Sequence, residues 1–324
     1  MRKTSVYLPD ALKDRLTDVA RRTGRSEAQL LRLAVERLVA AEPAGHAPIA
    51  RREDPVAARH RPGPALVGVG VGPGDPGLVT RRAVEVLRDA DRVVAPSTSA
   101  NAVGRAEAIV REVAPDVAVE RVAFVMEVGT AARAAALDAA ADTLVAHLDA
   151  GERVAFITLG DPNVYSTFSP LAAAVRRRRP AVPVEVVPGI MAFQDLAART
   201  GTTVVDGTEH LVLVPAHAAA GGAALAGAAA DPHAAVVVYK GGALVGEVAA
   251  TLAGHDRLDG AVMGELLGLP GGRVAALADV ADRPASYLAT VIVPPVRDPA
   301  GTADPAGTAG TAGTGGTLGT AAPS

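Results

Sequence analysis

The sequence predicts an α/β protein: two domains, one with a mainly parallel sheet and one with a mixed sheet, preceded by a small separate module. Three observations support this fold class. From Pro64 onward, short apolar runs alternate with helical patterns, as in strand–helix units of a parallel sheet. Glycine-rich turns close three of the apolar runs. Residues 1–43 follow a different pattern, one strand and two short helices.

Composition limits what the core and any pocket can be made of. The 324 residues suffice for two or three domains, and 49% of them are hydrophobic but only 2% aromatic. The core must therefore consist of valine, leucine and alanine. For the same reason we expect a pocket for a flat ligand to be aliphatic and to lack stacked aromatic rings.

Composition also excludes several classes of function. The absence of cysteine excludes disulfides, thiolate catalysis and thiolate metal sites, and no metal site is expected. A formal net charge of −3 argues against a generally nucleic-acid-binding surface. No apolar run is long enough for a membrane helix, and the N-terminus has no apolar secretory core. We therefore expect a soluble cytoplasmic protein.

Residues 1–43 form the first predicted unit. Residues 2–8 alternate in polarity as a strand does, and Asp10 can cap a helix that follows. Ser26 can cap a second helix, with Gln29 in the capping-box position. One strand and two short helices bury too little surface to fold alone, which favours a dimer that pairs the two strands.

This pattern resembles the ribbon-helix-helix DNA-binding domains, whose paired strands enter the major groove. The resemblance implies that Lys3, Ser5 and Tyr7 face base edges, while the start of the second helix near Ser26 faces phosphate. The alternative is a dimerisation module without DNA contact. Residues 44–63, rich in Pro, Ala, Arg and His, are predicted to be a linker, and residues 298–324 a disordered tail.

Residues 64–188 form the first predicted α/β domain. Its expected strands are 67–71, 91–96, 117–125, 154–159 and 184–187, and its expected helices are 83–87, 102–113, 130–150 and the segment from 171 to a basic last turn at 176–179. Residues 189–297 form the second domain. There we expect a helix at 192–199 and strands at 211–214, 236–239, 261–266, 274–278 and 287–293. The last two strands have little helix between them, which indicates a mixed sheet.

Three turns follow predicted strands and point to one site. Gly72 begins the first turn, Gly160-Asp161-Pro162 forms the second, and Pro188-Gly189 begins the third. Ligands of open α/β sheets bind in the crevice outside the carboxyl ends of the strands. Glycine lets the backbone approach a ligand closely, and Asp161 places an acceptor there. Three such turns suggest one shared crevice.

The turns also carry a family resemblance. GVGPGDPGLVT, LGDPNVYSTFS and VVPGI, in this order and spacing, resemble the tetrapyrrole methylases that use S-adenosylmethionine. YSTF at 165–168 and YKGG at 239–242 resemble most the branch that methylates C20 of precorrin-2. The resemblance covers roughly residues 64–295. It implies methyl transfer to C20 of precorrin-2, or of cobalt-precorrin-2, in cobalamin biosynthesis, by a homodimer.

The resemblance further implies that S-adenosylmethionine lies in a cleft between the two α/β domains. Transferred residue by residue, it places nine residues at this donor: Pro73, Leu159, Gly160, Asp161, Val164, Met191, Ala192, Tyr239 and Lys240. Tyr165, Ser166 and Thr167 could donate hydrogen bonds to the substrate, unless Ser166 or Thr167 only caps the next helix. Lys240 could pair with the substrate or be an ordinary surface lysine. No catalytic base is predicted.

Two classes of function therefore remain open. The first is an enzyme that methylates the tetrapyrrole. The second is a transcriptional regulator, in which a methylase-like domain senses a tetrapyrrole or S-adenosylmethionine and controls DNA binding through residues 1–43.

Overall fold

The computed structural model describes residues 10–41, 63–97, 103–124, 130–216, 223–240 and 242–297. The chain divides into two compact units, residues 1–62 and 63–324. The predicted strand at 2–8 with Lys3, Ser5 and Tyr7, the linker up to residue 62 and the tail from residue 298 lie outside the described residues.

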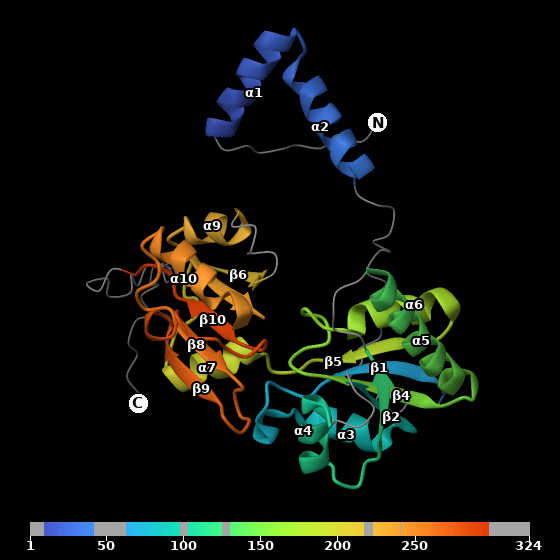
Figure 1. Cartoon of the computed structure of the whole chain (residues 1–324). Coiled ribbons are helices and arrows are strands. Elements are labelled where there is room, and N and C mark those ends of the chain that lie inside the picture. The colour runs from blue at the N-terminus through green and yellow to red at the C-terminus, as the bar shows by residue number, and fades with distance from the viewer. Residues whose placement is uncertain are drawn as a thin grey trace, which may run out of the picture. The chain divides into compact units, whose positions relative to one another are not determined.

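The first unit contains two helices, α1 (Asp10–Thr23) and α2 (Glu27–Ala41), which form a V (Figure 1). The predicted capping box is present: the Gln29 backbone donates to Ser26 Oγ at 3.3 Å, and the Ser26 backbone donates to Gln29 Oε1 at 2.9 Å. Glu27 accepts a hydrogen bond from Thr17 at 2.6 Å and pairs with Lys13, so it ties α2 to α1. From Lys13 to Ala34, no side chain is buried.

The first half of the second unit is a five-stranded parallel sheet in the order β3-β2-β4-β1-β5. Its strands are β1 (Ala65–Gly70), β2 (Arg92–Ser97), β3 (Val119–Ala123), β4 (Arg153–Thr158) and β5 (Val184–Val187). Successive strand residues point to opposite faces. On β1, Leu66 packs with α5 (Thr130–Asp149) and α6 (Phe168–Arg178), whereas Val67 packs with α3 (Arg81–Asp89) and α4 (Arg105–Val113).

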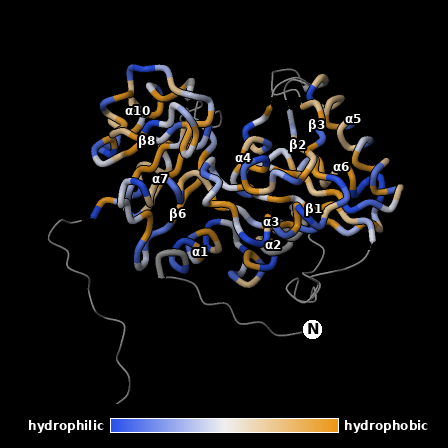
Figure 2. The backbone as a smooth tube through the Cα atoms, turned by 90° about the horizontal axis from the view of Figure 1, so that it is seen from below, coloured by the Kyte–Doolittle hydropathy of each residue, from blue (hydrophilic) through white to orange (hydrophobic). Residues whose placement is uncertain are grey.

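The two helical layers follow from the sequence of each helix. On α3, for instance, Ala83, Val86 and Leu87 are buried, whereas Arg81, Glu85 and Arg88 are exposed. Figure 2 shows this pattern as bands of hydrophobic and hydrophilic residues along the helices. Within the described part of the chain, no helix is long and apolar enough to cross a bilayer.

The second half carries the predicted mixed sheet, in the order β6-β7-β10-β8-β9. Its strands are β6 (His210–Pro215), β7 (Ala234–Tyr239), β8 (Val262–Glu265), β9 (Arg273–Ala276) and β10 (Thr290–Val293). β6 and β7 are parallel, and the other pairs are antiparallel. Helices α9 (Ala223–Ala229) and α10 (Val245–Ala253) cover one face, and α7 (Ala192–Thr200) packs against the other.

Arg257, which follows α10, links several backbone segments of the second half by hydrogen bonds. Its side chain is buried, and its guanidinium donates to the backbone carbonyls of Ala229, Asp231, Ala234 and Pro294 at 2.7–3.1 Å. A planar group with five donors can satisfy several carbonyls at once. The second sheet is thereby tied to the segment that follows α9 and to the end of β10.

Several predicted boundaries differ from the structure for local reasons. α3 begins at Arg81 because the Thr80 side chain accepts a hydrogen bond from the Ala83 backbone at 3.1 Å, and a short 3₁₀ turn, η1 (Pro76–Leu78), precedes it. The strand expected at 287–293 shortens to β10. Helices α9 and α10 were not predicted. The alanine- and glycine-rich segment of α9 carries little helical periodicity, whereas α10 does carry it, with Val245, Val248 and Leu252 on its buried face.

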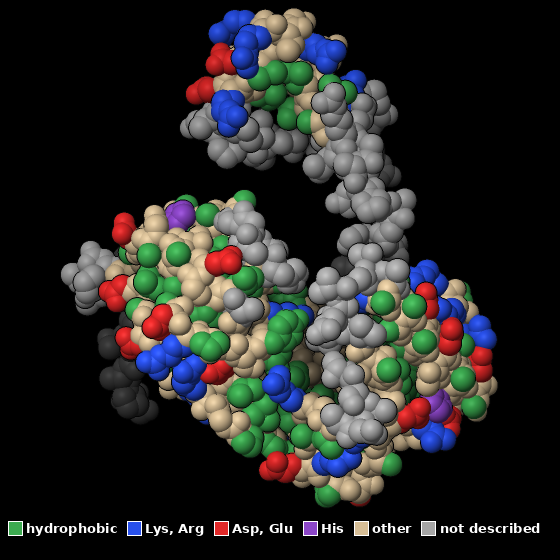
Figure 3. Space-filling view, in the orientation of Figure 1, with side chains coloured by type: hydrophobic (Ala, Val, Ile, Leu, Met, Phe, Trp, Pro, Cys, Tyr) green, Lys and Arg blue, Asp and Glu red, His purple; other side chains and the backbone are tan. Residues whose placement is uncertain are grey.

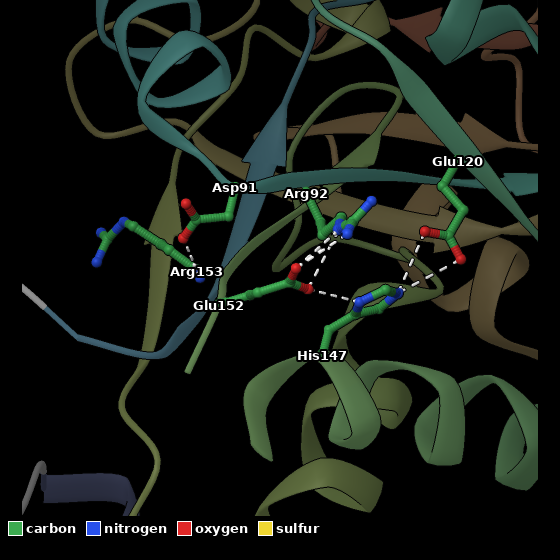
Figure 4. A network of polar contacts seen from close by, with 6 residues as sticks. All are labelled: Asp91, Arg92, Glu120, His147, Glu152 and Arg153. Carbon is green, nitrogen blue, oxygen red and sulfur yellow. Dashed lines mark hydrogen bonds and ion pairs between the residues drawn. The ribbon is translucent and has the colours of Figure 1, made fainter. Parts of the chain in front are cut away.

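A polar network lies at the amino ends of the first sheet's strands, opposite the three turns (Figure 4). Glu152 accepts hydrogen bonds from the Arg92 guanidinium at 3.0–3.2 Å and contacts His147 Nδ1 at 2.7 Å. The other ring nitrogen of His147 lies 3.2 Å from Glu120. The network therefore joins α5 to β2, β3 and the residue before β4.

We expect this network to make stability depend on pH. The Arg92 hydrogen bonds, with that of His147, hold the pKa of Glu152 below its usual range. A carboxylate with a lowered folded-state pKa contributes stability above its unfolded pKa, and the contribution is lost as pH falls through the folded value. Glu152→Gln should therefore lower the urea midpoint at about pH 7 but have less effect at about pH 3.5. Glu112→Gln, exposed on α4, is the control; equal losses at both pH values would contradict the prediction.

Candidate active site

The three glycine-rich turns lie together, as predicted. The Gly160 backbone N–H donates to the Gly72 carbonyl at 2.8 Å, which joins the second turn to the first. The Gly189 N–H donates to Asp161 Oδ2 at 3.1 Å, which joins the third turn to the second. The carboxyl ends of β1, β4 and β5 therefore meet at one place.

Glycine is required where these turns meet. A Cβ atom on Gly189 would lie 2.0 Å from the Gly160 carbonyl oxygen, and one on Gly70 would lie 2.4 Å from the same atom. Gly160 itself has φ of 63°, in the left-handed region that favours glycine. The backbones of the three turns are thus in direct contact, with no room for side chains between them.

The turns border a cavity of about 740 Å³. Hydrophobic side chains gather between the two sheet-bearing halves on the face shown in Figure 3. All twelve residues that the sequence predicted at the donor or the substrate line the cavity: Pro73, Leu159, Gly160, Asp161, Val164, Tyr165, Ser166, Thr167, Met191, Ala192, Tyr239 and Lys240. The structure brings them together, and their individual binding roles remain predictions.

Two further groups of lining residues were not predicted. One lies at the carboxyl ends of β2 and β3 and at the start of α4: Pro96, Ser97, Val103, Gly104, Arg105, Ala106 and Phe124. The other belongs to the second half: Leu266, Leu267, Leu269, Tyr287, Leu288 and Thr290. A signal for the first group was available, because β2 and β3 are parallel to β4 and end at the same edge of the sheet. The second group depends on tertiary packing alone.

The expectation of a purely aliphatic pocket is wrong. Three of the four tyrosines in the chain, Tyr165, Tyr239 and Tyr287, line the cavity together with Phe124. The Tyr165 and Tyr239 rings meet edge to face, with centroids 5.8 Å apart. A low aromatic content limits how many rings a protein has, but it does not say where the fold gathers them.

Backbone strain is concentrated in the same cavity. Four described non-glycine residues have positive φ, and three of them line it: Tyr165 at 47°, Lys240 at 61° and Leu266 at 50°. This conformation is unfavourable for residues with a Cβ atom and persists only where the surroundings enforce it. Residues held in this way are typical of functional sites.

Tyr165 connects the two halves across the cavity. Its hydroxyl donates to the carbonyl of Leu213 on β6 at 2.8 Å, and its own carbonyl accepts from Lys240 Nζ at 3.2 Å. The neighbouring Ser166 Oγ accepts from the Phe168 backbone at 3.0 Å, so it caps the start of α6. Thr167, in contrast, makes no side-chain capping bond.

Charge and hydrogen bonding distinguish the polar groups that line the cavity. Asp161 is its one carboxylate among the described residues; one oxygen accepts from Gly189 and the other from the Asn163 backbone at 2.8 Å. Arg105 and Lys240 are its cations. Burial raises the pKa of the Tyr239 phenol, which therefore stays protonated. This hydroxyl is buried and has no hydrogen-bond partner of normal geometry. The nearby Phe193 backbone opposes the rise in pKa without cancelling it.

Across the described ranges, no three histidine, aspartate or glutamate side chains are grouped as metal ligands would be.

Substitution of Gly189 tests whether the close contact of the turns holds the site together. Gly189→Ala should lower the free energy of unfolding by about 2 kcal/mol or more, because backbone atoms on both sides would have to move. The control is Gly227→Ala in α9, where an added Cβ meets nothing within 4 Å and alanine should stabilise the helix by roughly 0.5–1 kcal/mol. Urea denaturation measures both; two changes of the same sign would contradict the prediction.

Comparison with known proteins agrees with this arrangement. Residues 65–280 match the model of the tetrapyrrole (corrin/porphyrin) methylases. Residues 2–42 match the model of the ribbon-helix-helix proteins of the copG family. The N-terminal resemblance predicted from the sequence is thereby confirmed.

Individual relatives cover most of the second unit. The precorrin-2 C(20)-methyltransferase of Sinorhizobium sp is 34% identical over 242 residues, which are 72% of this chain and 96% of that protein. The cobalt-precorrin-2 C(20)-methyltransferase of Salmonella typhimurium is 30% identical over 233 residues, 70% of this chain and 95% of that protein.

A solved structure shares the fold. The uroporphyrin-III C-methyl transferase of Thermus thermophilus, complexed with S-adenosyl homocysteine, superposes with a TM-score of 0.51 at 23% identity, covering 71% of this chain and 97% of that one. The family model spans well over half of this chain, and the fold agrees with it. The chain therefore belongs to the tetrapyrrole (corrin/porphyrin) methylases.

Proposed function

We propose that this protein transfers the methyl group of S-adenosylmethionine to C20 of precorrin-2, or of its cobalt form, in cobalamin biosynthesis. The proposal rests mainly on the cavity that the three turns border, which is lined by all twelve residues predicted to bind the donor or the substrate. The two relatives named for this reaction, matched over nearly their whole length, support the choice of ring position.

The residues of the cavity fit the donor. S-adenosylmethionine offers amide-like, hydroxyl and adenine edges, which suit backbone groups more than a cluster of charges. An added Cβ on Gly160 would meet only Met191, at 3.9 Å, so its backbone can be approached closely. The buried Tyr239 hydroxyl is protonated and available as a donor. We propose that the nine donor residues predicted from the sequence, from Pro73 to Lys240, hold this ligand.

The main task of the protein in this reaction is alignment. When bound, the donor supplies a methyl group on an activated sulfonium, so no nucleophilic side chain is needed. Holding the two reactants in line can lower the barrier by about 7–11 kcal/mol. The contacts between Gly70, Gly160 and Gly189 provide the rigid wall that such alignment requires.

Asp161 is better suited to this structural role than to proton transfer. A base must take the proton that leaves C20, but both oxygens of Asp161 accept backbone N–H groups. Its hydrogen bonds fix the second and third turns against each other. The catalytic base therefore remains unassigned.

Methyl transfer can be measured directly. The purified protein, given labelled S-adenosylmethionine and precorrin-2 or cobalt-precorrin-2, should place label on C20, as seen by product mass and NMR. Ala192→Trp, which fills the cavity, should reduce kcat/KM roughly a hundredfold by displacing the donor. Ala132→Trp, exposed on α5, should not. Absence of label from the macrocycle would reject the enzyme, and label on another carbon would reject the ring position.

We propose further that the N-terminal module dimerises and binds DNA. Residues 2–42 match a ribbon-helix-helix model, and no side chain from Lys13 to Ala34, the part of this unit whose side chains are described, is buried. Pairing of two chains through residues 2–8 would bury these helices against a shared core. Lys3, Ser5 and Tyr7 would then face the major groove. The chain as a whole would act in the cytoplasm, either as an enzyme with a DNA-binding module or as a ligand-responsive regulator.

DNA binding can be tested with the upstream DNA of the protein's own gene in a mobility-shift assay. Lys3→Ala should weaken binding by about 1–3 kcal/mol if Lys3 contacts a base edge. Arg283→Ala, a loss of charge at an exposed position in the second unit, should leave it unchanged. Equal binding by both variants would contradict the proposed contact. A shift that responds to added tetrapyrrole or S-adenosylmethionine would favour the regulator, and a ligand-independent shift would count against it.

A further inference from the structure

We propose that Lys240 and Tyr287 form a substrate subsite, in which the lysine pairs with a carboxylate of the tetrapyrrole and the tyrosine ring packs against its ring system. The inference rests on the proposed function, because it assigns recognition of that substrate to one wall of the same cavity. Both residues lie in the second half of the unit and line the cavity.

The charge of the cavity favours an acidic ligand. Among the described residues that line it, two cations, Arg105 and Lys240, outnumber one carboxylate, Asp161, whose oxygens both accept hydrogen bonds from backbone N–H groups. The methyl donor carries one carboxylate beside an ammonium and a sulfonium, so its net charge is positive. A tetrapyrrole with carboxylate side chains is negative. A lysine ammonium in this cavity is therefore attracted to the substrate more strongly than to the donor.

Tyr287 is placed as a contact surface. Its side chain is 52% exposed although it lines the cavity, so it contributes little to the core. Its backbone is nonetheless held firmly: the Ser286 N–H donates to Glu265 Oε2 at 2.6 Å, and Gly242 packs so closely that a Cβ there would lie 2.0 Å from the Ser286 carbonyl oxygen. A rigidly supported and exposed ring suits packing against a flat apolar ligand.

Lys240 is held in the position that such a subsite needs. Its φ of 61° is unfavourable for a side-chain-bearing residue, and it directs the ammonium to a point 5.9 Å from the Tyr287 ring centroid. The same ammonium donates to the Tyr165 carbonyl at 3.2 Å. Lys240 lines the cavity, so a ligand there can reach its ammonium. The ammonium has three N–H donors, and the bond to Tyr165 uses one of them. The Lys240 backbone can still contact the methyl donor, while the side chain serves the substrate.

The test separates substrate recognition from donor binding. Lys240→Met keeps the length of the side chain and removes its charge; it should raise the KM for precorrin-2 about tenfold or more and leave calorimetric S-adenosylhomocysteine affinity within about twofold. Lys240→Arg should restore most of the loss, because the charge returns. Tyr287→Leu should also raise this KM, whereas Tyr287→Phe should not. Arg177→Met, exposed on α6 and outside the cavity, controls for the loss of a positive charge.

Several outcomes would overturn the subsite. If Lys240→Met binds the donor more weakly but keeps its KM for the tetrapyrrole, the side chain serves the donor and not the substrate. If Lys240→Met and Tyr287→Leu both keep a normal KM for the tetrapyrrole, the subsite does not exist. If the unaltered protein transfers no methyl group to precorrin-2, the proposed function fails, and the subsite is judged by calorimetric binding of uroporphyrin III, another tetrapyrrole polycarboxylate. Equal affinity of the unaltered protein and Lys240→Met for that probe would then reject it.

Discussion

The contact of three backbones at Gly70, Gly160 and Gly189 is the constraint on which the rest of the site depends. These glycines belong to β1 and to the turns after β4 and β5. A Cβ added to Gly70 or to Gly189 would overlap the Gly160 carbonyl oxygen. The hydrogen bonds of Gly160 to Gly72 and of Gly189 to Asp161 fix the same junction in register. A wall made of main chain, with few rotatable groups, gives a ligand a surface that is already organised before it binds.

A second part of the cavity lining is held in strained backbone conformations. Tyr165 and Lys240 adopt left-handed backbone conformations and reach toward each other, one from the loop after β4 and the other from the end of β7. The bond from the Tyr165 hydroxyl to Leu213 adds a second tie between the halves. The sequence of this loop therefore serves two purposes. Asp161 joins the second turn to the third by accepting a hydrogen bond from Gly189. Ser166, five residues later, accepts one from the Phe168 backbone and caps the start of α6.

Much of this arrangement could be predicted from the sequence because its signals are local. The glycine turns, the strands before them and the capping box at Ser26 are each set by a few adjacent residues. Helix α9 could not be, because its alanine- and glycine-rich segment has little periodicity and is stabilised by packing on the second sheet. Tyr287 was missed for a related reason: its place in the cavity depends on Glu265 and Gly242, both distant in the chain. Helix α10 had a local signal, the spacing of Val245, Val248 and Leu252, that the sequence reasoning did not use.

The uneven distribution of aromatic residues has a further consequence for how this protein absorbs and emits light. The chain has no tryptophan, and of its four tyrosines only Tyr7 belongs to the first unit. The other three surround the cavity. Intrinsic ultraviolet emission from the methylase unit therefore originates almost entirely at the lining of the cavity. A bound coloured macrocycle would quench it, so the protein carries its own optical reporter of occupancy without any attached dye.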